Sequence, residues 1–145
     1  MDTSWLLIAN RTDARLFEYS GHEFEKLEEI SHPEGRLKDQ DLISDDKGRV
    51  HDRAGQGSHK QEFHESPSDH EDRRFALALS RTLRKGLDDH RFDRLFLVAE
   101  PGFLGDLKQA LDKETTNALA GTLGKDLLHV ADKDIPGHVD ALLKP

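Results

Sequence analysis

Residues 95–99 read Leu-Phe-Leu-Val-Ala, and this short stretch is the strongest indication of the fold class. A half-buried strand alternates apolar and polar side chains, whereas an unbroken apolar run is typical of a strand that is covered on both faces. Strands of that kind usually have parallel neighbours, because the helices that connect parallel strands cross over the faces of the sheet. The stretch therefore predicts a central strand in an α/β sheet.

The residues before this strand predict a long helix that begins with Ser68 at its N-cap and ends near Asp88. Ser68 and Glu71 form a capping box, in which each side chain accepts a bond from a backbone N–H at the helix start. Apolar residues then recur at spacings of three and four, which indicates one buried stripe. The stripe consists of Phe75, Ala76, Leu79, Leu83 and Leu87, and the cations expected on its flanks are Arg73, Arg74, Arg81, Arg84 and Lys85.

Strands are expected to dominate the start of the chain. Three of them, separated by polar turns, are predicted at 4–10, 14–19 and 23–32. The apolar residues of the third are three apart, which also fits a helix, but the preceding hairpin favours a strand. After the central strand, a helix, a strand and a helix are predicted at 103–111, 118–123 and 132–143. The order β-β-β-α-β-α-β-α predicts a three-layer α/β fold with a mixed five-stranded sheet, similar to the ribonuclease-H-like topology, and right-handed crossovers place the long helices on the sheet's faces.

A long polar segment, residues 33–67, separates the third strand from the first helix. Its apolar side chains are few, so little burial offsets the entropy lost on ordering it. Loops of this length in a compact domain are usually either functional or disordered. We therefore expect a single domain over residues 1–145 in which 33–67 is a mobile loop, and we expect limited proteolysis to cut first between about Arg36 and Lys60.

Composition excludes several classes of function. The chain has 145 residues, of which 34% are apolar and 34% charged, and its formal net charge is -8. Duplex DNA is therefore not an expected partner, because affinity for its phosphates comes from clustered cations. The absence of cysteine excludes disulfides, thiolate zinc sites and a cysteine nucleophile. No apolar run is long enough to span a bilayer and the start lacks a signal peptide, so we expect a cytoplasmic protein without membrane insertion.

Motifs of familiar catalytic sites are absent from the sequence. A two-metal nuclease on this fold needs a carboxylate within the first strand, but residues 5–9 are Trp-Leu-Leu-Ile-Ala. The 9 histidines include His51, His59, His64 and His70, without the tight ligand spacing typical of a metal site. No GxSxG elbow, P-loop or GxGxxG occurs either. The sequence therefore names no catalytic residue, no metal ligand and no cofactor.

The segment 48–60 contains the candidate contact site. Three cations make it locally basic within an acidic chain, and two glycines flank Gln56. Glycine permits backbone conformations that are closed to other residues, so this tip could present the Gln56 amide to water or RNA, or could serve only as a hinge. The candidate RNA- or ribosome-contact residues are Arg49, Arg53, Gly55, Gln56, Gly57 and Lys60.

Four segments resemble the bacterial host-attachment protein family. Residues 5–17, Trp-Leu-Leu-Ile-Ala-Asn-Arg-Thr-Asp-Ala-Arg-Leu-Phe, are similar to its opening hairpin, and residues 71–76, Glu-Asp-Arg-Arg-Phe-Ala, to its first long helix. Residues 97–105, Leu-Val-Ala-Glu-Pro-Gly-Phe-Leu-Gly, resemble its strand-to-helix junction, and residues 125–127, Lys-Asp-Leu, a short motif near its end. The resemblance covers nearly the whole chain. The family is named for proteins that some plant-associated bacteria need to attach to host cells, which describes a phenotype rather than a molecular activity.

The family also resembles the central domain of archaeal and eukaryotic class-1 release factors. In those proteins a Gly-Gly-Gln tip on a long loop enters the peptidyl-transferase centre of the ribosome and helps to hydrolyse peptidyl-tRNA. Gly55 and Gln56 lie in the corresponding loop here, with Ala54 in place of the first glycine. Stop-codon recognition is not expected, because the domains that read codons are not part of this sequence.

Three hypotheses of function follow. The first is a non-enzymatic, cytoplasmic accessory protein of the host-attachment family that acts through an unknown protein partner. The second is a ribosome-associated RNA-binding protein, or a release-factor-like rescue protein, that uses residues 53–60. The third is a metal-dependent hydrolase that uses the loop histidines. The sequence favours the first, because it offers no catalytic motif.

Overall fold

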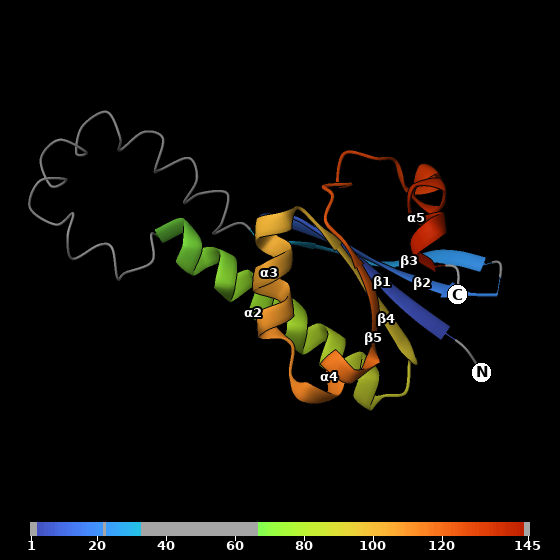
Figure 1. Cartoon of the computed structure of the whole chain (residues 1–145), viewed down its shortest axis with the longest axis horizontal. Coiled ribbons are helices and arrows are strands. Elements are labelled where there is room, and N and C mark those ends of the chain that lie inside the picture. Colours follow the sequence, from blue (N-terminus) through green and yellow to red (C-terminus); the bar gives the residue numbers. More distant parts are fainter. Residues whose placement is uncertain (1–2, 22, 33–66, 144–145) are drawn as a thin grey trace, which may run out of the picture.

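The computed structural model describes residues 3–21, 23–32 and 67–143. These residues form a mixed five-stranded sheet of order β3-β2-β1-β4-β5 with helices packed against it (Figure 1). The first three strands form an antiparallel meander, β1 (Thr3–Ala9), β2 (Asp13–Ser20) and β3 (Glu23–Ser31). The other two continue the sheet in parallel from β1, namely β4 (Arg94–Ala99) and β5 (Leu119–Leu123). The predicted α/β class with a mixed five-stranded sheet is confirmed, and its layers agree with a ribonuclease-H-like arrangement.

Strand β4 is covered on both faces, as its unbroken apolar sequence predicts. Its residues alternate between two clusters of buried side chains, so that Leu97 packs in one cluster and Val98 in the other. The middle position of the sheet belongs to β1, however, and not to β4. Residues 5–9 of β1 are equally apolar and buried on both faces, and β1 joins the antiparallel meander to the parallel strands.

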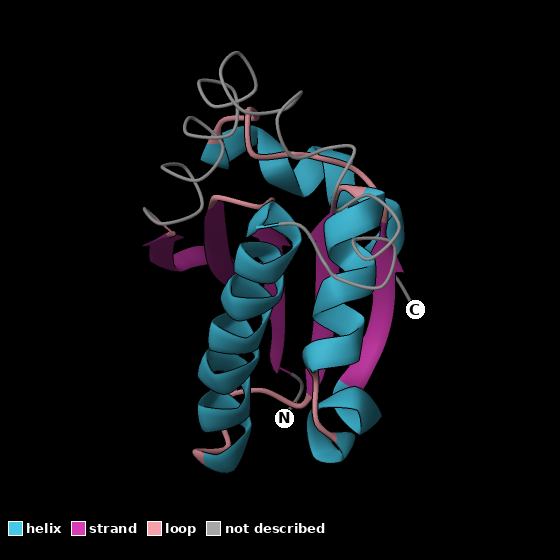
Figure 2. Cartoon of the chain, turned by 90° about the vertical axis from the view of Figure 1, so that its left-hand side faces the viewer, coloured by secondary structure: helices cyan, strands magenta, loops and turns pink. Residues whose placement is uncertain are grey.

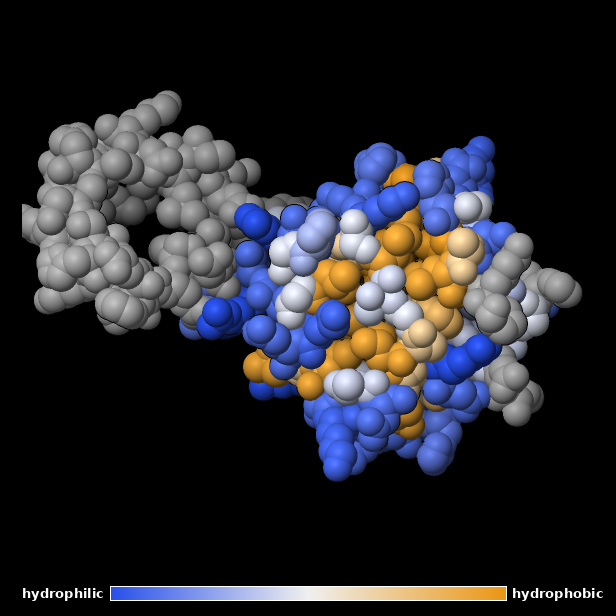
Figure 3. Space-filling view, viewed as in Figure 1, coloured by the Kyte–Doolittle hydropathy of each residue, from blue (hydrophilic) through white to orange (hydrophobic). Residues whose placement is uncertain are grey.

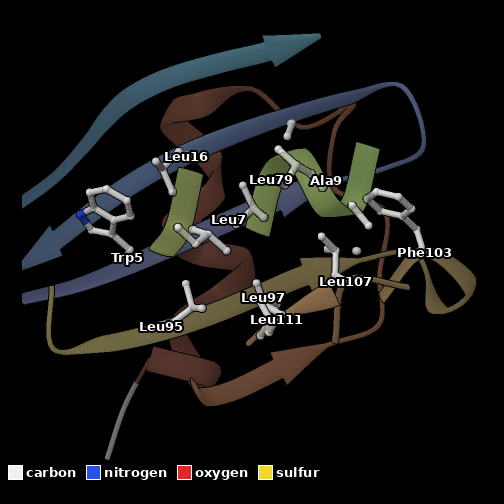
Figure 4. Packing of buried hydrophobic residues seen from close by; sticks show 14 of the residues in the cluster. Trp5, Leu7, Ala9, Leu16, Leu79, Leu95, Leu97, Phe103, Leu107 and Leu111 are labelled. Carbon is white, nitrogen blue, oxygen red and sulfur yellow. The ribbon is translucent and has the colours of Figure 1, made fainter. Parts of the chain in front are cut away.

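Helices α2 (Pro67–Asp88) and α3 (Pro101–Ala110) lie side by side on one face of the sheet (Figure 2). Figure 4 shows Leu79 of α2 and Leu107 of α3 among the strand side chains Leu7 and Leu97. The 3-10 helix η1 (Asp132–Asp134) leads into α5 (Ile135–Leu143), which covers the opposite face. Both long helices therefore share one face, and the short last helix completes the third layer.

The helices differ from the predicted ones in three respects. Helix α2 begins at Pro67, so Ser68 lies inside the helix rather than at its N-cap; proline suits a first helical position because its missing N–H needs no partner there. Glu100 is the N-cap of α3 and accepts a bond from the backbone N–H of Phe103 at 2.8 Å. A further helix, α4 (Lys113–Ala118), precedes β5, and its 6 residues are too few to show a helical period.

Two sequence predictions concern the chain as a whole. The loop predicted over 33–67 falls, except for its last residue, outside the described residues, so its mobility and the single-domain organisation stay predictions. Within the ranges that the structure does describe, no helix combines the length and the apolar character needed to cross a bilayer.

Candidate functional site

The contact residues predicted from the sequence lie outside the described residues. This holds for Arg49, Arg53, Gly55, Gln56, Gly57 and Lys60, and also for the loop histidines His51, His59 and His64. His70 is described and is exposed on α2. In the described ranges, no three His, Cys, Asp or Glu side chains form a group that could hold a metal ion.

The end of β3 and the start of α2 are joined by a contact between His32 and Glu71. His32 follows β3 and Glu71 lies near the start of α2, and His32 Nε2 is 3.0 Å from Glu71 Oε1. The His32 ring also stacks on Phe75, with ring centroids 4.8 Å apart and planes inclined by 11°. Glu71 is only 5% exposed, and Arg74 Nη1 lies 3.7 Å from its second oxygen. These contacts therefore hold the residue after β3 against the first turns of α2.

A polar cluster lies beside this point, where the parallel strands β1 and β4 end. Ligand sites of α/β sheets commonly occupy the carboxyl ends of strands. Arg11 Nε is 3.5 Å from Asp72 Oδ2 and 3.9 Å from Glu100 Oε1. A hollow of about 240 Å³ is lined by Asn10, Arg11, Thr12, Glu100 and Asp126.

The polar atoms of this cluster have structural partners. Asn10 Oδ1 accepts bonds from the backbone N–H groups of Thr12 and Asp13, both at 2.9 Å, and so closes the turn between β1 and β2. Glu100 caps α3, and Asp72 is paired with Arg11. The cluster therefore holds the strand ends and the start of two helices together.

The exposed side of α2 carries a row of cations around one leucine. Arg73, Leu77, Arg81 and Lys85 follow one another at spacings of four, so they share one side of the helix, and all four are exposed. Leu77 is 43% exposed and is the one large apolar residue of the described ranges that is exposed rather than buried or partly buried. We call these four residues the basic stripe.

An open groove runs beside the basic stripe, between α2 and the end of α3. Two hollows of about 450 and 290 Å³ adjoin each other there, because both are lined by Leu77 and Ala110, and we call the two together the groove. The Ser80 hydroxyl donates to the Ala110 carbonyl oxygen at 2.9 Å and joins the two helices there. The two helices stand next to each other in Figure 2.

The cations along the groove differ in their electrostatic surroundings. Arg84 pairs with Asp88 at 2.8 Å and with Asp112 at 2.9 Å, and these hydrogen bonds raise the pKa of Arg84. Lys85 Nζ is 3.6 Å from Asp89, whereas Arg81 makes no ion pair within the described part of the chain. Three aspartates, Asp88, Asp89 and Asp112, line the same hollow as three cations of α2, so the surroundings of the groove are close to neutral on a chain of net charge -8.

The basic stripe is a feature that the sequence contained but the prediction did not single out. The cations were expected on the flanks of α2, and Leu77 falls outside the predicted buried stripe. Its spacing of four from Arg73 and Arg81 is the signal that places it among them. The groove had no such signal, because Ala110 reaches it from a different helix.

Two solved structures are similar to this chain at low sequence identity. Among solved structures, the crystal structure of the archaeal translation termination factor aRF1 is 13% identical, with a TM-score of 0.47 over 97% of this chain and 39% of that chain. A structure described as an archaeal protein is 14% identical, with a TM-score of 0.49 and 38% of its own chain covered. The chain thus spans about two fifths of the length of each. No curated protein matches the sequence.

The family model described as "protein required for attachment to host cells" matches residues 5–139. That range runs from β1 into α5 and includes all four segments on which the family resemblance was based. The predicted family is confirmed, and the chain belongs to the family of proteins required for attachment to host cells.

Proposed function

We propose that this member of the host-attachment family is a non-enzymatic binding protein whose protein partner docks on the basic stripe and the adjoining groove. The observation that carries the proposal is the exposure of Leu77 in line with Arg73, Arg81 and Lys85. Protein-binding surfaces combine a small apolar centre with a polar rim, and arginine is enriched in them. The groove lies next to Leu77 and provides a recess beside this apolar centre.

The charges of the basic stripe define the chemistry of the partner. An acidic segment of the partner would place its carboxylates near Arg81 and Lys85. This surface would repel such a segment less than the rest of this protein does, because the protein has a net charge of -8. An apolar side chain of the same segment would contact Leu77 and Ala110, which the two hollows share. Binding should weaken with salt, because exposed charges are screened.

The polar clusters of the described region support binding rather than catalysis. His32 contacts Glu71 and Phe75, and Glu100 caps a helix, so each already holds two parts of the chain together. We infer that the protein acts in the cytoplasm and that its effect on attachment is indirect.

The experiment that tests this proposal is affinity capture with the full chain from the cells that produce it, comparing the wild type with Leu77→Asp and Arg81→Glu. Both positions are exposed, so both variants should keep the wild-type melting temperature. Each is expected to reduce the captured partner roughly tenfold or more, the effect of losing about 1.4 kcal/mol of binding free energy.

Lys108→Glu is the matched control, because Lys108 is an exposed cation of α3 that does not line the groove. It should retain the partner. If the same protein is captured equally by the wild type, by both stripe variants and by the control, the basic stripe is not the docking site.

A second candidate function is favoured by the contact between His32 and Glu71, because these two residues come before and after the segment 33–66 in the sequence. In this proposal the loop residues contact RNA or the ribosome, and Gln56 orients water as in the release factors. Co-sedimentation with ribosomes at low salt that is lost at high salt, and lost in an Arg53→Ala, Lys60→Ala double variant, would support it. Peptidyl-tRNA cleavage that Gln56→Ala abolishes would show release activity, and no co-sedimentation at low salt would exclude this candidate.

A further inference from the structure

The two edge strands of the described sheet differ in how they are protected against a further strand. Charged side chains at an edge discourage strand addition. Along β3 the sequence Glu-Phe-Glu-Lys-Leu-Glu-Glu-Ile-Ser is dominated by charge, whereas β5, Leu-Ala-Gly-Thr-Leu, contains neither a charged residue nor a proline. Within the described residues β5 has a neighbouring strand on one side only. The β5 edge is therefore the one suited to pair with another strand.

Apolar side chains surround β5 on both faces of the sheet. Leu104 and Leu119 are partly buried against the cluster under α2 and α3, and Leu123 and Leu142 against the cluster under α5. Figure 3 looks onto this side of the molecule and shows hydrophobic residues gathered around β5, between α3 and α5. A partner at this edge would cover apolar surface in addition to pairing with the backbone.

The pairing of β5 with β4 determines which face each β5 residue occupies. Phe96, Leu97 and Val98 pair in sequence with Gly121, Thr122 and Leu123, whereas Ala120 is the extra residue of an irregularity before them. A Cβ atom on Gly121 would lie 2.9 Å from Leu142 of α5. Leu123 packs in the cluster of the same face. Because side chains alternate along a strand, Thr122 lies on the face that carries α2 and α3.

We propose that two copies of this chain associate through their β5 edges as antiparallel strands, with a twofold axis at Thr122. In that register Leu123 of each copy lies opposite Gly121 of the other on the α5 face, and the two Thr122 residues lie opposite each other on the other face. A twofold interface must be self-complementary. In the proposed dimer, Leu123 of each copy covers Gly121 of the other copy, and the two Thr122 side chains can form a hydrogen bond.

Charge repulsion between two copies is smallest at the β5 edge. Each chain has a net charge of -8, so two copies repel each other over most of their surfaces. The β5 edge is a place where they can meet without bringing charged side chains opposite each other, because no residue of β5 is charged. The β3 edge would instead place glutamates of one copy against those of the other.

Sedimentation equilibrium of the full chain tests the proposal. The wild type is expected to show twice the mass of the 16.4 kDa chain, with the dimer fraction rising over the micromolar range. Thr122→Asp and Thr122→Lys each place like charges opposite each other and should be monomeric where the wild type is a dimer. An equimolar mixture of the two variants should restore the dimer, because the opposed charges are then complementary.

Glu28→Lys on the β3 edge is the control and should remain dimeric, since it changes the charge of the other edge strand. Hydrogen exchange of the wild type gives a second measurement that needs no variant: the amides of 119–123 should exchange more slowly as the concentration rises. A wild type that stays monomeric up to near-millimolar concentration, exchange that is independent of concentration, or a dimer that both Thr122 variants leave intact would each overturn the proposal.

Discussion

Replacing Arg15 with methionine should destabilise the fold by about 2–3 kcal/mol. Arg15 lies on β2, and its side chain is only 9% exposed. Its guanidinium donates from Nη1 to Asp132 Oδ1 and from Nη2 to the carbonyl oxygens of Leu127 and Leu128. It thereby fastens the connection between β5 and α5 to the sheet.

The magnitude follows from what each acceptor loses. The Leu127 carbonyl oxygen keeps a bond from the backbone N–H of Val130 at 3.0 Å, whereas the Leu128 carbonyl oxygen loses its charged donor. Losing the two bonds from the guanidinium to these carbonyl oxygens should cost about 1–3 kcal/mol. Asp132 is 42% exposed and keeps Lys26 at 2.8 Å, so its pairing with Arg15 contributes less than about 1 kcal/mol. Relief from burying a cation offsets part of the loss. Methionine keeps the apolar stem, so the change reports mainly on the polar contacts.

Urea unfolding followed by circular dichroism measures the difference in the free energy of unfolding between Arg15→Met and the wild type. In a thermal scan, the melting temperature of the variant should be lower by roughly 5–10 °C for a chain of this size. Asp132→Asn is the matched variant, because it weakens the ion pair and leaves both carbonyl contacts of Arg15 in place. It should cost less than about 1 kcal/mol. The reasoning is refuted if Arg15→Met is as stable as the wild type, or if Asp132→Asn costs as much as Arg15→Met.

Three further predictions concern a helix glycine, the core and acid stability. Gly86→Ala should lower the free energy of unfolding by about 1–3 kcal/mol, because a Cβ atom at this position would lie 2.4 Å from the Trp5 ring. This loss should exceed the gain expected from the higher helix propensity of alanine. A variant that is more stable than the wild type in urea unfolding would contradict this packing. Leu97→Asp should bury an unpaired carboxylate and cost several kcal/mol, roughly enough to unfold the domain, so a native circular dichroism spectrum with an unchanged melting temperature would remove Leu97 from the core. The backbone N–H of Thr115 lowers the pKa of Asp112 below 3.8, so Asp112 stabilises the fold above that pH and the stabilisation is lost as the pH falls through the lowered value. Asp112→Asn should therefore lose less stability than the wild type on acidification below pH 3.8, and identical acid unfolding of the two proteins would contradict the assignment.

The candidate site shows where prediction from sequence stops. The positions of Arg73, Leu77 and Arg81 on one side of α2 follow from their spacing, because a helix brings every fourth residue to the same side. The groove beside them does not follow, since Ala110 and Asp112 come from the end of α3 and the residues after it. The groove exists only because α2 and α3 pack on the same face of the sheet.

The sequence by itself determined the types and order of the main elements. Burial leaves a local pattern, so the unbroken apolar run at 95–99 indicated a strand covered on both faces, and the spacing from Phe75 to Leu83 indicated a helix with one buried side. Each of these patterns lies within one element and needs no knowledge of the rest of the chain. The short α4 escaped prediction because its 6 residues are fewer than two helical turns.

Which elements meet became clear only from their packing. A buried pattern shows that a surface is covered but not by what, so the sequence did not show that β1 takes the middle of the sheet or that α5 and Leu127 cover the second face. Arg15 illustrates the reason most directly. It lies in a predicted hairpin strand whose sequence does not indicate a partner for it, yet it is buried because its acceptors at Leu127, Leu128 and Asp132 come from the other end of the chain. Such contacts are selected by the packing of the whole domain, and no local pattern of residues records them.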